Sequence, residues 1–185
     1  MSSIYLSPSV QELNPYITGG NEQYYMNRIA DAMIPRLQAG GVRIARNSPG
    51  DTLEEIVAQS NAADCDLHLA LHSNAAPPTL PGALRGPDVY YYAYSDEGAR
   101  AAKFFSDRLK AIYPQPDLVA VIPNTTLTEL RRAEAPAILI ELGYHDNRED
   151  SQWISDSTDD IALAMAQAVF GYLGIPLAGP DPSAL

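Results

Sequence analysis

Residues 66–75 read DLHLALHSNA, and this stretch holds two of the three histidines of the chain, His68 and His72. Leucines alternate with His68, Ala70 and His72, which is the period of two expected of a β-strand. On a helix, two histidines four residues apart can bind one zinc ion. On a strand they stand roughly 13 Å apart, too far for zinc–nitrogen bonds of about 2 Å. We therefore predict a strand in which the two histidines have separate roles, with His68 buried and paired to a neighbour.

A second short run, AILIEL at residues 137–142, is almost wholly apolar, which is typical of a strand covered on both faces. Further strands are expected at residues 4–6, 42–45 and 89–94, and residues 118–122 could be another strand or an extended segment. Helices are expected at 21–37, 51–62, 95–113 and 158–172. This alternation predicts an α/β fold, a single domain with a mostly parallel central sheet flanked by helices. We assign residues 1–175 to this domain and residues 176–185 to a flexible C-terminal tail.

Capping signals mark the starts of two predicted helices. Asn21 is expected to cap the first helix, and Pro35 should kink that helix or mark its end. Asp51 and Glu54 have the spacing of a capping box, which predicts that the second helix begins there, with Leu53 on its inner face.

Composition narrows the class of partner. The chain has 185 residues, 46% of them hydrophobic, which suits one substantial core. A formal net charge of −11 argues against nucleic acid and anionic membrane surfaces as partners. The single cysteine, Cys65, excludes an intramolecular disulfide, and no apolar stretch of about 18 residues predicts a membrane span. The start, MSSIYLSPSVQELNPY, lacks a basic segment followed by an apolar run, so we expect a cytoplasmic location.

Polar residues at strand and helix ends are the candidates for a site. The chain lacks a Walker A loop and the G-x-G-x-x-G, G-x-S-x-G, C-x-x-C and H-E-x-x-H motifs. His72 ends one predicted strand, at the edge where open α/β sheets place their sites. Glu141 lies in the apolar run, where a carboxylate is costly unless it is paired, protonated or functional. Glu22 begins the first helix, where a favourable interaction with the helix dipole would also explain it.

Two segments together resemble a known family. DLHLALHSNA and PAILIELGYHDNRED look like hallmark segments of the zinc-dependent N-acetylmuramoyl-L-alanine amidases of the amidase-3 family. The first typically reads D-x-x-x-S-x-H-x-N-A there, with Ala70 replacing the serine here, and the second P-A-x-L-x-E-x-G-F/Y-x-x-N. NEQYYMNRIADAM resembles the family helix that begins with a glutamate, and Asn27 also fits it. The resemblance covers roughly residues 3 to 174.

The resemblance implies a function and a set of site residues. Glu22 and His72 become zinc ligands and Glu141 the catalytic carboxylate. The reaction implied is hydrolysis of the amide between N-acetylmuramic acid and L-alanine in peptidoglycan or muropeptides. Zinc would activate a water molecule and polarise the carbonyl, while the carboxylate moves the proton. The site of action would then be the cell wall, after release or export of the protein.

One segment departs from the family pattern. The family's first zinc ligand is a histidine in a D-P-G-H-G-G loop, and aligning Ser7-Pro8 with its aspartate-proline places Val10 at that position. Gln11 or His145 could complete the metal site, or the site is completed by water or poor in metal. Together with Asn74, these two residues are also candidates for substrate binding.

Two alternative functions therefore stay open. The first is a catalytically impaired pseudo-amidase that binds muropeptides or a partner protein. The second is a zinc hydrolase of another amide, because motifs fix a reaction class better than a substrate.

Overall fold

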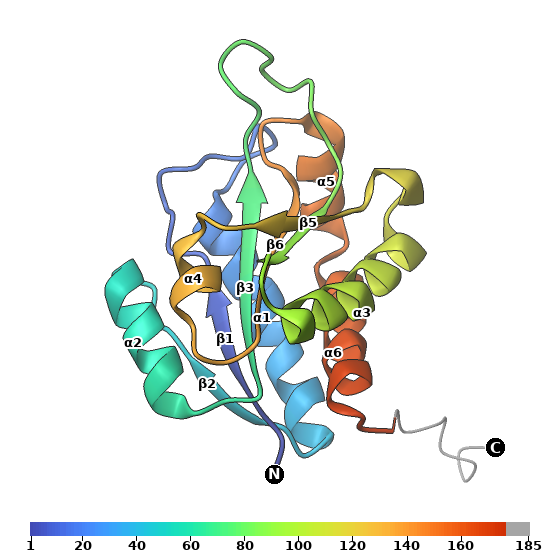
Figure 1. Cartoon of the computed structure of the whole chain (residues 1–185). Coiled ribbons are helices and arrows are strands. Elements are labelled where there is room, and N and C mark those ends of the chain that lie inside the picture. The colour runs from blue at the N-terminus through green and yellow to red at the C-terminus, as the bar shows by residue number, and fades with distance from the viewer. Residues whose placement is uncertain (177–185) are drawn as a thin grey trace, which may run out of the picture.

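A six-stranded sheet in the order β2-β1-β3-β6-β4-β5 forms the centre of the protein (Figure 1). The strands are β1 (Ser3–Pro8), β2 (Arg43–Arg46), β3 (Leu67–Asn74), β4 (Asp88–Tyr92), β5 (Ala120–Asn124) and β6 (Ala137–Tyr144). All neighbours pair in parallel except β4 and β6, which are antiparallel. The computed structural model describes residues 1–176, and the predicted α/β fold with a mostly parallel sheet is confirmed. The predicted tail lies outside the described residues from residue 177 onward.

Helices cover both faces of the sheet unequally. The helices are α1 (Glu22–Ala39), α2 (Leu53–Ala63), α3 (Asp96–Ile112), η1 (Pro116–Leu118), α4 (Thr128–Arg132), α5 (Arg148–Asp156) and α6 (Thr158–Leu173). Helices α1, α3 and α6 pack on one face and enclose the large hydrophobic core. Helices α2 and α4 lie over the other face, where two smaller apolar clusters form (Figure 1). No helix of residues 1–176 is long and apolar enough to cross a membrane.

The alternation along β3 sorts its side chains between these two faces. Leu67, Leu69 and Leu71 are fully buried in the large core. His68 and His72 are on the opposite face, toward α2 and α4, because successive side chains of a strand point to opposite sides. The strand prediction for this stretch is thereby confirmed.

Strand β6 repeats the same division. Ile138 and Ile140 are fully buried in the large core, whereas Leu139 joins the small cluster beneath α4. Glu141 is on that second face too, and it is paired in register with His72 of β3. Because α4 has only five residues, this face is thinly covered near the carboxyl ends of β1, β3 and β6. An opening there is the place where an α/β sheet accommodates a ligand.

Several predicted boundaries shift in the structure. Asn21 caps α1 as predicted, but the helix continues past Pro35 to Ala39. The capping box of α2 joins Thr52 to Glu55, one residue later than predicted, because the Thr52 hydroxyl accepts from the Glu55 backbone N–H. Leu53 is therefore not on the inner face of α2 and is 44% exposed.

Candidate active site

A cleft of 330 Å³ opens on the face of the sheet that α2 and α4 cover. Its lining comes from the end of β1, from β3 and β6, and from the starts of α2 and α4. The lining residues are Ser7, Pro8, Ser9, Val10, Gln11, Leu53, Ile56, His72, Leu127, Thr128, Glu129, Leu139 and Glu141. The cleft thus combines an apolar wall with a few polar groups, which is the usual character of a small-molecule site.

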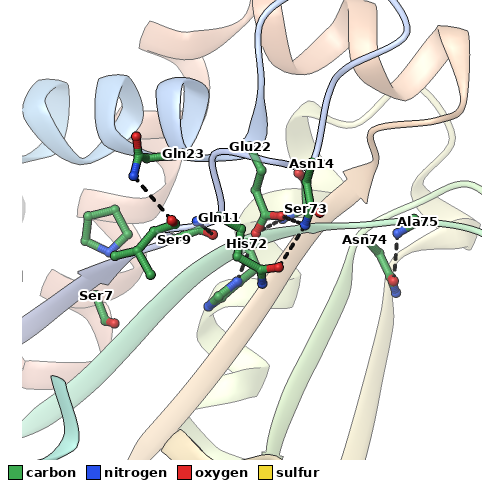
Figure 2. A network of polar contacts seen from close by, with 12 residues as sticks. Ser7, Ser9, Gln11, Asn14, Glu22, Gln23, His72, Ser73, Asn74 and Ala75 are labelled. Carbon is green, nitrogen blue, oxygen red and sulfur yellow. Dashed lines mark hydrogen bonds and ion pairs between the residues drawn. The ribbon is translucent and has the colours of Figure 1, made fainter. Parts of the chain in front are cut away.

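Glu22 is held rigidly beside this cleft. It is the first residue of α1, only 1% exposed, and its Oε1 accepts from His72 Nδ1 at 3.0 Å. Asn14 donates to Glu22 Oε2 at 2.6 Å, and Figure 2 shows both contacts. Burial alone would raise the pKa of Glu22, but the hydrogen bond and charge of His72, with the amide of Asn14, outweigh it and lower that pKa. Glu22 is therefore an ionised carboxylate directed at His72.

His72 lies between two carboxylates. Its Nδ1 contacts Glu22, and its Nε2 is 3.4 Å from Oε1 of Glu129. Burial alone would lower the pKa of His72, but hydrogen bonds to Glu129 and Glu22 raise it to about 10. In this arrangement each ring nitrogen of His72 faces a carboxylate oxygen.

His68 and His72 contact the same carboxylate, that of Glu129. His68 is fully buried, with Nε2 2.8 Å from Glu129 Oε2 and Nδ1 2.8 Å from Ser60 Oγ. Its ring stacks on Tyr5, with 5.4 Å between ring centroids. The prediction of a buried strand histidine paired to a neighbour is confirmed.

Glu129 is the residue of this site that sequence reasoning missed. It is 5% exposed, and Ser7 Oγ donates to its Oε2 at 2.7 Å. Burial would raise the pKa of Glu129, but hydrogen bonds from His68 and His72 lower it well below its usual value. Glu129 belongs to no motif, and α4 has no side-chain cap that would mark it. The available signal was indirect, since a buried histidine in an apolar strand needs a hydrogen-bond partner.

Glu141 differs from the other two carboxylates because one oxygen has no partner. Its Oε2 is buried without a hydrogen bond. Burial raises the pKa of Glu141 to about 7; His72 opposes this shift, while the charges of Glu22 and Asp88 add to it. A carboxyl group that titrates near neutral pH at the wall of a cleft can both accept and donate a proton.

This pKa makes stability depend on pH. The folded state binds the Glu141 proton more tightly than the unfolded state, whose pKa is near 4.5, so the stabilisation is complete below pH 4.5 and is lost as pH rises through 7. We expect Glu141→Gln, which stays neutral, to gain about 3 kcal/mol of unfolding free energy relative to wild type between pH 4.5 and 7.5. Urea unfolding in a chelating buffer measures this difference. A difference between Glu141→Gln and wild type that stays constant from pH 4.5 to 7.5 would contradict it, and the exposed Glu134→Gln serves as the control.

The structure places the remaining predicted residues at different distances from this centre. Gln11 lines the cleft, and its Oε1 accepts from Asn14, which also donates to Glu22. Asn74 turns away and accepts from the Ala75 backbone N–H (Figure 2). His145 is buried outside the cleft lining, with Nδ1 3.0 Å from the Pro15 carbonyl oxygen. Glu22, His72, Glu141 and Gln11 are thus brought together, whereas Asn74 and His145 are not.

The donors present do not complete a zinc site of three protein ligands. Glu22 and His72 face each other as two ligands of one ion would. Val10, which the family resemblance places at a third ligand position, packs against Tyr5, Ile56 and Cys65. Within residues 1–176, no group of three or more His, Cys, Asp or Glu side chains is arranged to hold a metal ion. Structural zinc sites use four protein ligands and catalytic sites three, so two donors fall short.

Comparisons with known proteins agree on family and fold. A family model described as N-acetylmuramoyl-L-alanine amidase matches residues 13–170, so the match begins after Val10. No curated protein matches the chain significantly. An N-acetylmuramoyl-L-alanine amidase from Clostridium difficile 630 is similar in structure, with a TM-score of 0.82, 20% identity, and coverage of 94% of this chain and 97% of that one. Amidases from Nostoc punctiforme (20% identity) and Mycobacterium smegmatis (22%) each give a TM-score of 0.78 with the same coverages.

Proposed function

Because the chain belongs to the N-acetylmuramoyl-L-alanine amidase family, we propose that its cleft hydrolyses the amide between the lactyl group of muramic acid and L-alanine in peptidoglycan fragments. The observation that carries this proposal is Glu141, a carboxyl with an unpartnered buried oxygen and a pKa of about 7 at the cleft wall. The proposed site of action is the cell wall, after release or export of the protein.

Glu141 supplies the proton transfers of this reaction. As a carboxylate it accepts the proton of a water molecule that attacks the amide carbonyl carbon. As an acid it then returns that proton to the alanine nitrogen while the carbon–nitrogen bond breaks. The products are a lactyl carboxylate on the sugar and a peptide with a free amino terminus. A pKa near the working pH suits both roles, because each protonation state is then well populated.

The rest of the cleft suits the groups that flank this bond. The lactyl and alanyl groups each carry a methyl, and Val10, Ile56 and Leu139 supply an apolar wall near Glu141. His72 is fixed beside Glu141 because the two residues are register partners on adjacent strands. The resemblance implies zinc dependence, for which only Glu22 and His72 would serve as ligands. The proton transfers proposed for Glu141 do not require a metal.

A second candidate function is favoured by Val10. A valine where the family pattern has a ligand leaves a cleft that can bind a muropeptide without cleaving it. The pseudo-amidase differs from the hydrolase only in turnover, so binding and cleavage have to be measured separately.

Product analysis tests the proposal. The protein is incubated with a purified disaccharide tetrapeptide, once with added zinc and once with a chelator, and the products are identified by mass spectrometry. Hydrolysis predicts a free disaccharide with a lactyl carboxylate and a tetrapeptide beginning with L-alanine. Binding by calorimetry without any product would support the pseudo-amidase. Neither binding nor product would contradict both candidates.

A further inference from the structure

Glu129 contacts His72 at the cleft with one carboxylate oxygen and the buried residues His68 and Ser7 with the other. Its Oε1 is 3.4 Å from Nε2 of His72, the side of the ring opposite to Glu22. Its Oε2 contacts His68 and accepts from Ser7. Glu129 also lines the cleft, so a buried carboxylate with three polar contacts stands at the wall where substrate would bind.

We infer that Glu129 is a positioning residue of this site: it holds His72 from the Nε2 side and so keeps Nδ1 directed at Glu22 in the cleft beside Glu141. This inference rests on the proposed function for its catalytic consequence. The claim that Glu129 fixes the His72 ring concerns the free protein and depends only on the contacts among Glu129, His72 and Glu22.

A histidine ring needs a partner at each nitrogen to have one orientation. The χ2 torsion of histidine is broad and roughly two-fold, so sterics alone leave a flipped ring available. The His72 side chain is 15% exposed where it lines the cleft. With a carboxylate oxygen facing each nitrogen, a flip of the ring would break both contacts. In metal-binding histidines, a carboxylate that contacts the second ring nitrogen commonly fixes the orientation of the ring, and Glu129 contacts the second nitrogen of His72 in the same way.

Glu129 can act in this way because it is itself held from several elements. His68 of β3 fixes its Oε2, and the other nitrogen of that ring is fixed by Ser60 of α2. Leu130 next to Glu129 is 3% exposed and packs on Ala70 and Leu139, so packing sets the place of the short α4. The orientation of the His72 ring therefore depends on Glu129, which is held by Ser7 of β1 and by His68 of β3. His68 is held in turn by Ser60 of α2.

The test compares Glu129→Gln with Glu134→Gln, the same substitution at an exposed position five residues away without a side-chain contact to the cleft. Ring ¹H–¹⁵N spectra report the Nε2–H of His72 in the free protein. We expect this signal in wild type and Glu134→Gln, and its loss or broadening in Glu129→Gln. An unchanged His72 signal in Glu129→Gln would overturn the inference.

Steady-state kinetics then separate positioning from a general loss of fold. In Glu129→Gln we expect kcat to fall about 10- to 100-fold with KM within about 3-fold of wild type. Equal kcat in Glu129→Gln and Glu134→Gln would contradict this. If the wild-type protein cleaves no substrate, this result counts against the proposed function alone. The ring spectra still show whether Glu129 fixes the orientation of the His72 ring. If Glu129→Gln does not fold, Ser7→Ala removes one hydrogen bond to Glu129 and should weaken the same signal; an unchanged signal would again overturn the inference.

Discussion

Replacing Glu141 by glutamine is expected to lower kcat for muropeptide hydrolysis by about 100- to 10,000-fold, the range for loss of a general acid–base group. Glutamine has nearly the same shape and burial, but it can neither take the proton of water nor return one to the leaving amine. Because Glu141 Oε2 makes no hydrogen bond within residues 1–176, the substitution removes no contact of that kind at this atom. We therefore expect muropeptide affinity to change little, and the loss to appear in kcat.

The matched control for this result is Glu134→Gln, which makes the same charge change on the surface. Product release is followed by liquid chromatography at saturating substrate, and affinity by calorimetry. Glu141→Gln with more than a tenth of wild-type kcat would contradict the role given to Glu141. Equal inertness of wild type and variant, with binding intact, would instead favour the pseudo-amidase.

Replacing Val10 by histidine is expected to raise the affinity of the protein for zinc by more than about 100-fold. A second-shell partner alone changes metal affinity 10- to 100-fold, and an added ligand should exceed that. Val10 lines the same cleft as His72 at the end of β1, so an imidazole there would add a third donor to Glu22 and His72. Three protein donors and a water molecule are the usual set of a catalytic zinc site.

Zinc content after dialysis, measured by elemental analysis, checks this result. Val10→Leu is the control, because it keeps the wall apolar and adds no donor. We expect near-stoichiometric zinc in Val10→His and far less in wild type and Val10→Leu. Wild type that keeps one zinc ion per chain through dialysis would contradict the description of its donor set as incomplete.

The strands of the core could be predicted from sequence because their signal is local. Alternation at residues 67–72 and the apolar run at 137–142 each reflect burial of whole strand faces, so period and hydrophobicity were enough. Helix ends were less certain. The predicted capping box began at Asp51, whereas in the structure Thr52 caps α2. Helix α5 was not predicted, although Asn147 caps it, because its nine residues are mostly polar.

The site was predictable only where a motif covered it. Glu22 and His72 are 50 residues apart, and their expected proximity came from the family resemblance rather than from any local pattern. Glu129 had no such help. It is separated by 57 residues from His72 and by 122 from Ser7, and these contacts arise only when α4 packs on the sheet. The question raised by DLHLALHSNA is answered by this residue, since His68 and His72 meet at one carboxylate.

The proposed chemistry requires the scissile amide to bind beside Glu141 in this cleft, and a crystal structure of Glu141→Gln with an intact muropeptide would locate that bond. We expect the lactyl–alanyl carbonyl carbon to lie next to residue 141 and His72, with the methyl groups against Val10 and Leu139. Density for the muropeptide elsewhere, for example in the surface hollow formed by Asn61, Cys65 and Pro136, would contradict it.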